Sequence, residues 1–196
     1  MKVSDSLCHI CDRRYHFPSF AILAALAATV LVLRWQGRLW WCECGGWAPW
    51  SGDSHGRHNS QHLFDPYTFS HVLHGIIFFG ALHVIWPKGS YAWRLVISLL
   101  LECGWELLEN SSFVIERYRN TTAAIGYVGD SVFNSLADVL SSGIGFWLAG
   151  RIGLWKSVAV IVVVELGMLF TVRDNLTLNI VMMIYPIEAI KTWQNG

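Results

Sequence analysis

The chain has 196 residues, enough for one domain and too few for two of ordinary size. It is 54% hydrophobic and 14% charged, whereas soluble domains average about 25% charged residues. The formal net charge is zero, so the composition gives no indication of a nucleic-acid partner, and none is expected. The composition predicts a membrane protein.

The apolar residues fall into blocks about as long as the roughly 20 helical residues that cross a bilayer. These blocks are continuous rather than alternating, which favours helices over a β-barrel. We expect a single transmembrane domain over residues 1–196, an all-α bundle of about six spans, or five if the last block lies in the membrane interface. The expected spans are residues 18–35, 67–86, 91–108, 130–149, 154–172 and 176–190.

Two segments outside the spans have a distinct character. Residues 1–17 are expected to form an N-terminal tail, and the span after them lacks a small-residue cleavage site, which predicts a retained anchor rather than a signal peptide. Residues 36–66 are expected to form an extramembrane loop rich in Trp and His. Clustered Trp beside a span is typical of side chains at the depth of the lipid headgroups.

The five cysteines are an odd number and cannot all be paired within the chain. Cys8 and Cys11 form a C-x-x-C motif near two histidines of the tail, but the spacing matches no common zinc finger. In the loop, Cys42 and Cys44 are separated by one residue, so a disulfide between them would be strained. We therefore expect these four thiols to be reduced.

Polar side chains recur at helical spacing in three consecutive spans. They are His71 and His74 in the second span, Glu102, Glu106 and Glu109 in the third, and Asp130, Asn134 and Asp138 in the fourth. Within each span the spacing places them on one face of the helix. A charged residue at the centre of a spanning helix costs about 2.5–3.5 kcal/mol, so three acids facing lipid would cost roughly 8–10 kcal/mol together. The stripes must therefore face the interior of the bundle.

Acids inside a bundle must be neutralised by protons, by a cation, by the histidines, or by an arginine such as Arg117 or Arg119. The site residues that we predict are His71, His74, Glu102, Glu106, Asp130, Asn134 and Asp138. A divalent metal, zinc or iron, would suit an imidazole and carboxylate set. The candidate ligands are His71, His74, Glu106 and Asp138.

Several motifs resemble a family of uncharacterised multi-pass proteins from alphaproteobacteria. They are H-V-L-H-G at 71–75, E-C-G-W-E-L-L-E-N at 102–110, G-D-S-V-F-N-S-L-A-D at 129–138, R-D-N-L at 173–176 and P-I-E-A-I at 186–190. More distantly, the order of His, Glu and Gly-Asp-x-x-x-Asn is similar to the VanZ-like superfamily. The resemblance implies a protein of the bacterial inner membrane, and it implies no particular reaction.

Three functions are compatible with the stripes. The first is a membrane-embedded enzyme, metal-dependent or acid–base, that acts on a lipid or a lipid-linked small molecule. The second is a proton-coupled transporter, because intramembrane acids and histidines form proton relays. The third is an assembly or scaffolding subunit, in which the same groups hold helices together. The sequence does not determine the oligomeric state.

Basic residues and small residues predict the arrangement of the spans. With six spans, eight Lys and Arg lie on the side of the termini and six on the other, which favours both termini in the cytoplasm. In the fourth span, Ser141 and Gly145, and likewise Ser142 and Gly150, are small residues at spacings of four and eight. Small residues at helical spacing predict a close approach to a neighbouring helix.

Overall fold

The computed structural model describes residues 4–122, 124 and 126–196, with side chains described from Phe17 onward. The described part of the chain forms eight helices and no β-strand, so the predicted all-α fold is confirmed. The helices are α1 (Ser4–Trp35), α2 (Thr68–Ile85), α3 (Tyr91–Glu109), α4 (Ser112–Thr121), α5 (Val132–Ile152), α6 (Leu154–Thr171), α7 (Leu176–Ile184) and α8 (Glu188–Gln194). The first helix begins at Ser4, within the segment expected as a tail.

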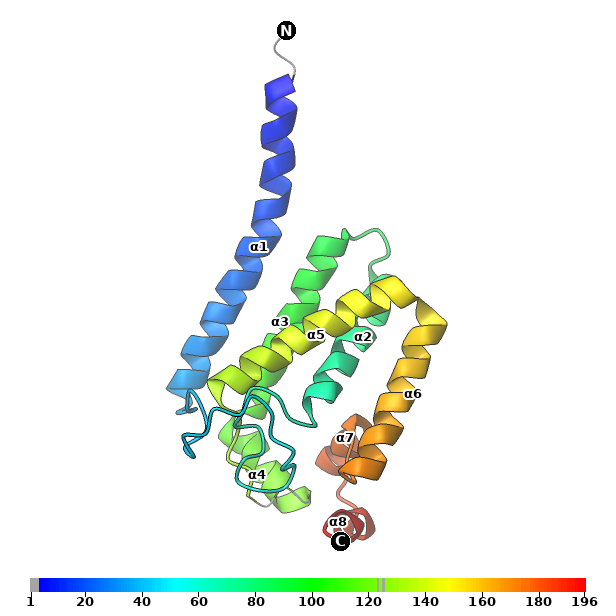
Figure 1. Cartoon of the computed structure of the whole chain (residues 1–196). Coiled ribbons are helices and arrows are strands. Elements are labelled where there is room, and N and C mark those ends of the chain that lie inside the picture. The colour runs from blue at the N-terminus through cyan, green and yellow to red at the C-terminus, as the bar shows by residue number, and fades with distance from the viewer. Residues whose placement is uncertain (1–3, 123, 125) are drawn as a thin grey trace.

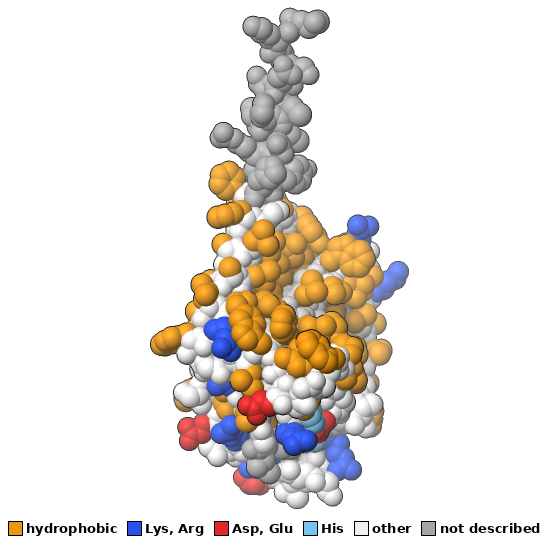
Figure 2. Space-filling model, turned by 60° about the vertical axis from the view of Figure 1, so that its left-hand side comes forward, with side chains coloured by type: hydrophobic (Ala, Val, Ile, Leu, Met, Phe, Trp, Pro, Cys, Tyr) orange, Lys and Arg blue, Asp and Glu red, His pale blue; other side chains and the backbone are white. Residues whose placement is uncertain are grey.

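Among the described residues, four helices are long and apolar enough to cross a membrane: Phe17–Trp35 of α1, and α2, α5 and α6. Figure 2 shows hydrophobic side chains covering this part of the molecule, with the Asp and Glu of that face gathered at the end that carries the loops. An exposed apolar surface this extensive is typical of a protein that contacts a membrane. The prediction of a helical membrane protein is confirmed at this level.

The third predicted span is α3, which has the length of a span but carries Arg94, Glu102, Glu106 and Glu109. It packs against α1, α2 and α5 and lies within the bundle (Figure 1). Packing on three sides lets α3 turn its acids toward other helices instead of lipid. Helix α3 therefore supplies the polar part of the bundle interior.

The last predicted span, residues 176–190, is wrong. It forms two short helices, α7 and α8, separated at Tyr185 and Pro186. A proline cannot donate the helical hydrogen bond and disfavours helix in the residue before it. The nine residues of α7 span only about 13 Å, less than half the hydrocarbon thickness.

Without this sixth span, the charge argument for orientation no longer holds. The amino-terminal end of α1 and helix α8 lie at opposite ends of the molecule (Figure 1). Lys191 then belongs with the opposite group of basic residues, and eight against six becomes seven against seven. Equal numbers of basic residues favour neither orientation.

Helices α2 and α5 are in direct backbone contact. A Cβ on Gly75 would lie 1.8 Å from the carbonyl oxygen of Ser142, and a Cβ on Gly145 would lie 2.0 Å from that of Val72. Only glycine permits such contact between two helix backbones. The close approach predicted at Gly145 is confirmed, and it sets the distance between the polar stripes of α2 and α5.

The start of α7 is held by a carboxylate of α6. Glu165 accepts hydrogen bonds from the amides of Leu176 and Thr177, each at 3.1 Å. Asn175 accepts from the amide of Leu178 at 2.8 Å and donates to the Glu165 carbonyl oxygen at 3.2 Å. These contacts satisfy the free amides of the first turn and place a negative charge at the positive end of the helix. They fix α7 to α6.

Candidate functional site

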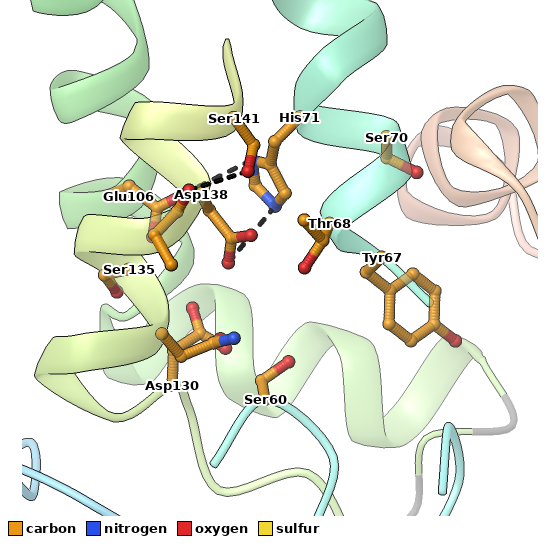
Figure 3. A network of polar contacts seen from close by, with 12 residues as sticks. Ser60, Tyr67, Thr68, Ser70, His71, Glu106, Asp130, Ser135, Asp138 and Ser141 are labelled. Atoms are coloured by element: carbon orange, nitrogen blue, oxygen red, sulfur yellow. Dashed lines mark hydrogen bonds and ion pairs between the residues drawn. The ribbon is translucent and has the colours of Figure 1, made fainter. Parts of the chain in front are cut away.

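His71 is the centre of a buried polar cluster formed by three helices (Figure 3). Its Nδ1 atom is 2.6 Å from Oε1 of Glu102 and 3.4 Å from Oε1 of Glu106. Its Nε2 atom is 3.8 Å from Oδ2 of Asp138. Both glutamates are fully buried, and Asp138 is 3% exposed. The stripes of α2, α3 and α5 therefore meet at this imidazole.

His74 lies one turn further along α2 and shares Glu102 with His71. Its Nδ1 atom is 3.1 Å from both carboxylate oxygens of Glu102, and its ring packs edge-on against Trp105. Glu102 is thus bound by two imidazoles and has no need of a further partner. The histidines are one of the expected means of neutralising the buried acids.

Other buried oxygens of the cluster have no such partner. Both carboxylate oxygens of Glu106, Oδ1 of Asp138 and Oδ1 of Asn134 accept no hydrogen bond from any described residue. Leaving a buried polar group unpaired costs about 1–3 kcal/mol, and more for a charged group. These oxygens therefore require a proton, a cation, water or a substrate group.

The predicted stripe of α5 divides between neighbouring clusters. Asp130 lies before the helix, where it accepts hydrogen bonds from Asn110 Nδ2 at 2.7 Å and from the Tyr127 hydroxyl at 2.8 Å. Asn134 is directed toward the loop, with Nδ2 3.5 Å from Asp65 Oδ2. Only Asp138 reaches His71. Asp130 and Asn134 thus lie outside the imidazole cluster, before α5 and in its first turn.

A cavity of about 130 Å³ extends from the imidazole cluster to Asp130. Its polar lining includes Tyr67, His71, His74, Asp130, Asp138 and Asp174. Its apolar wall is formed by Leu176, Ile180 and Met183 of α7. Ile180 is 48% exposed, so this wall reaches the outer surface of the molecule. The cavity combines a polar floor with an apolar side.

The arginines named as partners for the acids lie elsewhere. Arg117 donates from Nε to the Met183 carbonyl oxygen at 2.9 Å. Arg119 donates from Nε to the Tyr127 carbonyl oxygen at 2.5 Å. Both guanidinium groups therefore bind backbone at the end of the bundle and do not neutralise the cluster.

The expected metal ligands separate into two sets that share His71. In one set, ligand atoms of His71, His74 and Glu102 lie within 4.8 Å of one another; in the other, those of His71, Glu106 and Asp138 do. The 2.6 Å contact between His71 and Glu102 is already a complete hydrogen bond. The second set contains the unpaired oxygens and is therefore the better fit to a cation.

Asp65 is a site residue that the sequence argument missed. Its carboxylate accepts hydrogen bonds from the amides of Ser60, Tyr67 and Thr68 at 3.1, 2.7 and 3.3 Å. In return, its own amide donates to the Thr68 hydroxyl at 3.1 Å. The available signal was an Asp placed three residues before Thr at the start of a span, which is a capping pattern. Asp65 fixes the first turn of α2, which leads to His71.

Asp174, in the turn between α6 and α7, gives the cavity a pH-dependent group. It accepts hydrogen bonds from the Tyr67 hydroxyl at 3.0 Å, the Asn175 amide at 2.9 Å and Gln194 Nε2 at 3.0 Å. Burial nevertheless raises the pKa of Asp174 from its ordinary value of 3.8 to about 6. The folded protein therefore binds this proton more tightly than the unfolded chain does.

The raised pKa of Asp174 makes the stability of the folded protein depend on pH. Because the folded pKa is the higher one, the contribution of Asp174 to the free energy of unfolding falls as the pH rises from about 4 to about 6 and is constant above. We expect wild type to lose stability relative to Asp174→Asn over this range, measured by thermal unfolding in detergent. A difference in Tm that does not change with pH would contradict the assignment.

Comparison with known proteins agrees with the resemblance in the motifs. Residues 33–196 match the family described as "Protein of unknown function (DUF2585)". A "UPF0314 protein" of Sphingopyxis alaskensis is 46% identical over 176 residues, covering 90% of this chain and 93% of the relative. One from Rhizobium meliloti is 44% identical over 185 residues, covering 94% of each.

A third relative, from Paracoccus denitrificans, is 42% identical over 177 residues, covering 90% of this chain and 92% of its own length. Comparison with solved structures gives no match. The matched region includes every residue of the imidazole cluster. The chain belongs to the DUF2585 family of UPF0314 proteins from alphaproteobacteria, whose function is unknown.

Proposed function

We propose that the protein is an enzyme of the bacterial inner membrane that uses His71 for acid–base chemistry on the polar end of a lipid or lipid-linked substrate. The observation that carries the proposal is the position of His71, which is held by Glu102 on one ring nitrogen and faces Asp138 and the cavity with the other. The distant VanZ-like similarity stays an expectation.

The contact with Glu102 determines which nitrogen of His71 is reactive. A carboxylate oxygen 2.6 Å from Nδ1 requires a proton between the two atoms. In the neutral imidazole, Nε2 then carries the free lone pair. The same carboxylate stabilises the imidazolium that forms when Nε2 takes up a proton. Glu102 is therefore a positioning residue, and His71 is the proposed general base.

The two remaining acids favour proton transfer over metal binding at His71. Glu106 approaches Nδ1, whereas Asp138 approaches Nε2. The hydrogen bond to Glu102 already occupies Nδ1, so a metal ion could bind only at Nε2, whereas a proton relay can use both nitrogens of the ring. In the proposed mechanism, Glu106 is protonated, because its oxygens have no donor among the described residues.

The shape of the cavity suggests the class of substrate. Asp138, Asp174 and Tyr67 offer hydrogen bonds to a polar group, while the α7 wall offers an apolar surface that reaches the exterior at Ile180. A lipid has these two parts in this order, and its acyl chains can remain in the bilayer while the headgroup enters the cavity. This match favours an amphiphile over a small polar solute.

The chemistry that follows is one proton transfer in each direction. Nε2 of His71 removes a proton from a water molecule or hydroxyl group, whose oxygen then attacks the substrate. The imidazolium afterwards returns the proton to the leaving group, so the enzyme ends in its starting state. Asp138 is placed beside Nε2 to bind the attacking group.

The proposal is tested by lipid analysis of a strain that lacks the gene, complemented in turn with wild type, His71→Asn and His83→Asn. His83 is on the same helix but is exposed and contacts Arg94, so it is a matched control. We expect the His71→Asn strain to accumulate the same lipid or lipid-linked species as the deletion strain, with at least about 100-fold less turnover. The His83→Asn strain should match wild type.

Other results would reject the enzyme and identify an alternative. If all strains have the same lipids, but wild type acidifies or alkalinises proteoliposomes and His71→Asn does not, the protein is a transporter. If His71→Asn complements fully while a partner protein co-purifies, the cluster is structural. Size-exclusion profiles of the two variants in detergent show that both are folded.

A further inference from the structure

The segment between α1 and α2 is a long loop with little regular structure. Residues 36–67 contain no helix and only an isolated bridge between Trp50 and Phe64. Loops of more than about 12–15 residues without secondary structure are uncommon in compact domains unless they are functional. Because this loop has neither a helix nor a sheet, side-chain contacts must hold it in place.

Four side chains of the loop converge with the geometry of a metal site. The Cys42 sulfur is 3.4 Å from His58 Nδ1, and the Cys44 sulfur is 3.8 Å from His62 Nε2. All four ligand atoms lie within 4.8 Å of one another. Zinc bonds of about 2.3 Å to sulfur and 2.0–2.1 Å to nitrogen place tetrahedral S and N ligands about 3.6 Å apart. The two distances in the structure, 3.4 and 3.8 Å, lie on either side of this value.

We propose that Cys42, Cys44, His58 and His62 bind a structural zinc ion. Two thiolates and two imidazoles form a set that selects zinc among divalent metals and completes a tetrahedron. The two histidines are four residues apart, as in many zinc fingers, while the cysteines are one residue closer than usual. The site is separate from the imidazole cluster of His71 and does not depend on the proposed enzyme.

The surroundings of His62 prepare it to bind a metal. Its Nδ1 atom is 2.7 Å from the carbonyl oxygen of Ala48, which places the ring proton on Nδ1. Nε2 then presents its lone pair toward the Cys44 sulfur. A second contact that fixes the tautomer is the usual feature of a zinc-bound histidine.

The sulfur atoms have favourable surroundings too. The amide of Cys44 donates to the Cys42 sulfur, and the amide of Gly46 donates to the Cys44 sulfur, each at 3.4 Å. Amide donors aimed at sulfur stabilise the thiolate that a metal requires. Both cysteines are free thiols.

His58 has to exchange one contact when the metal binds. Arg57 donates from Nε to His58 Nε2 at 3.4 Å, whereas coordination through Nδ1 needs the ring proton on Nε2. Arg57 is exposed, so its side chain can turn into solvent at little cost. Cys42, Cys44 and His58 line a cavity of about 570 Å³, through which an ion can reach the site.

Zinc at this position would also hold the polar cavity in shape. The residues between the two histidines include Ser60, whose carbonyl oxygen accepts from the Ser131 amide at 2.9 Å, and Gln61, which donates to the Gly129 carbonyl oxygen at 2.6 Å. Ser60 lines the cavity that contains His71. The metal would therefore link the loop to the start of α5.

The test is elemental analysis of the full-length protein, purified in detergent after growth with added zinc. We expect about one zinc per chain in wild type, and a content about tenfold lower or less in Cys42→Ser and His62→Asn. His55→Asn, in the same loop, and His71→Asn, in the buried cluster, should both keep the zinc. Loss in His71→Asn with retention in Cys42→Ser would move the metal to the buried cluster and overturn the assignment.

A second measurement does not depend on the folding of any variant. Wild type loaded with Co²⁺ should show the intense visible bands of a tetrahedral ion together with thiolate-to-cobalt charge transfer. Treatment with a chelator should abolish both signals and speed proteolysis between α1 and α2. Wild type that binds neither zinc nor cobalt, or a cobalt spectrum without a thiolate band, would refute the proposal.

Discussion

Replacing Gly75 by alanine is expected to separate α2 from α5 and to unfold much of the protein in detergent. The added Cβ would lie 1.8 Å from the Ser142 carbonyl oxygen and 2.7 Å from the Phe146 amide nitrogen. These are backbone atoms, so no change of rotamer can relieve the clash. We expect a loss of about 3 kcal/mol or more, at the upper end of what overpacking costs.

The matched control is Gly80→Ala on the same helix. A Cβ at Gly80 meets nothing within 4 Å, and alanine is favoured over glycine in a helix by about 1 kcal/mol. Thermal unfolding followed by size-exclusion chromatography should show a much lower Tm for Gly75→Ala and an unchanged or higher Tm for Gly80→Ala. Equal Tm values for the two variants would mean that the helices are not in backbone contact.

Replacing Asp65 by alanine is expected to have the second largest effect. Three amides lose their acceptor, and Asp65 itself is only 1% exposed. Loss of a cap costs about 0.5–2 kcal/mol when its amides can turn to water, and a buried amide left unpaired costs about 1–3 kcal/mol, so the total depends on how many of the three amides reach water. A destabilisation of roughly 3 kcal/mol is expected, together with a displaced first turn of α2.

Asp53→Ala tests whether the effect of Asp65→Ala belongs to its position. Asp53 lies in the same loop, but it is exposed and its carboxylate accepts from the Gly56 amide alone, at 2.8 Å, among the described residues. We expect it to change the free energy of unfolding by less than about 1 kcal/mol. Chemical or thermal denaturation of both variants measures the difference. An equal effect at the two positions would show that Asp65 is not a structural cap.

The sequence predicted the bundle and the polar stripes because both follow from local rules. The length of an apolar block fixes a span, and the energetic cost of a charge in lipid fixes the direction of Glu102, Glu106 and Asp138. The structure places these acids within reach of His71. Helical spacing and the cost of a charge in lipid together were sufficient for this part of the site.

Other features depend on contacts between distant segments, which spacing does not reveal. Cys42 and His58 belong to a loop without periodicity, so their convergence could not be read from a repeat. Asp65 and Asp174 become buried only when the loops fold over the end of the bundle. The polar stretch after α3 contains the short helix α4. Its N-cap, Ser111, accepts from the Val114 amide and is a local signal that the polar composition of the segment concealed.

The contacts of Glu165 have a consequence for the bilayer. Only 11% of the residues of α6 are buried in the molecule, so most of the helix is free to face lipid, yet its Glu165 carboxylate holds the first turn of α7. Because α7 forms the apolar wall of the cavity, tilting of α6 in a thinner or thicker bilayer moves that wall as well. We therefore expect the width of the cavity at its α7 wall to change with membrane thickness.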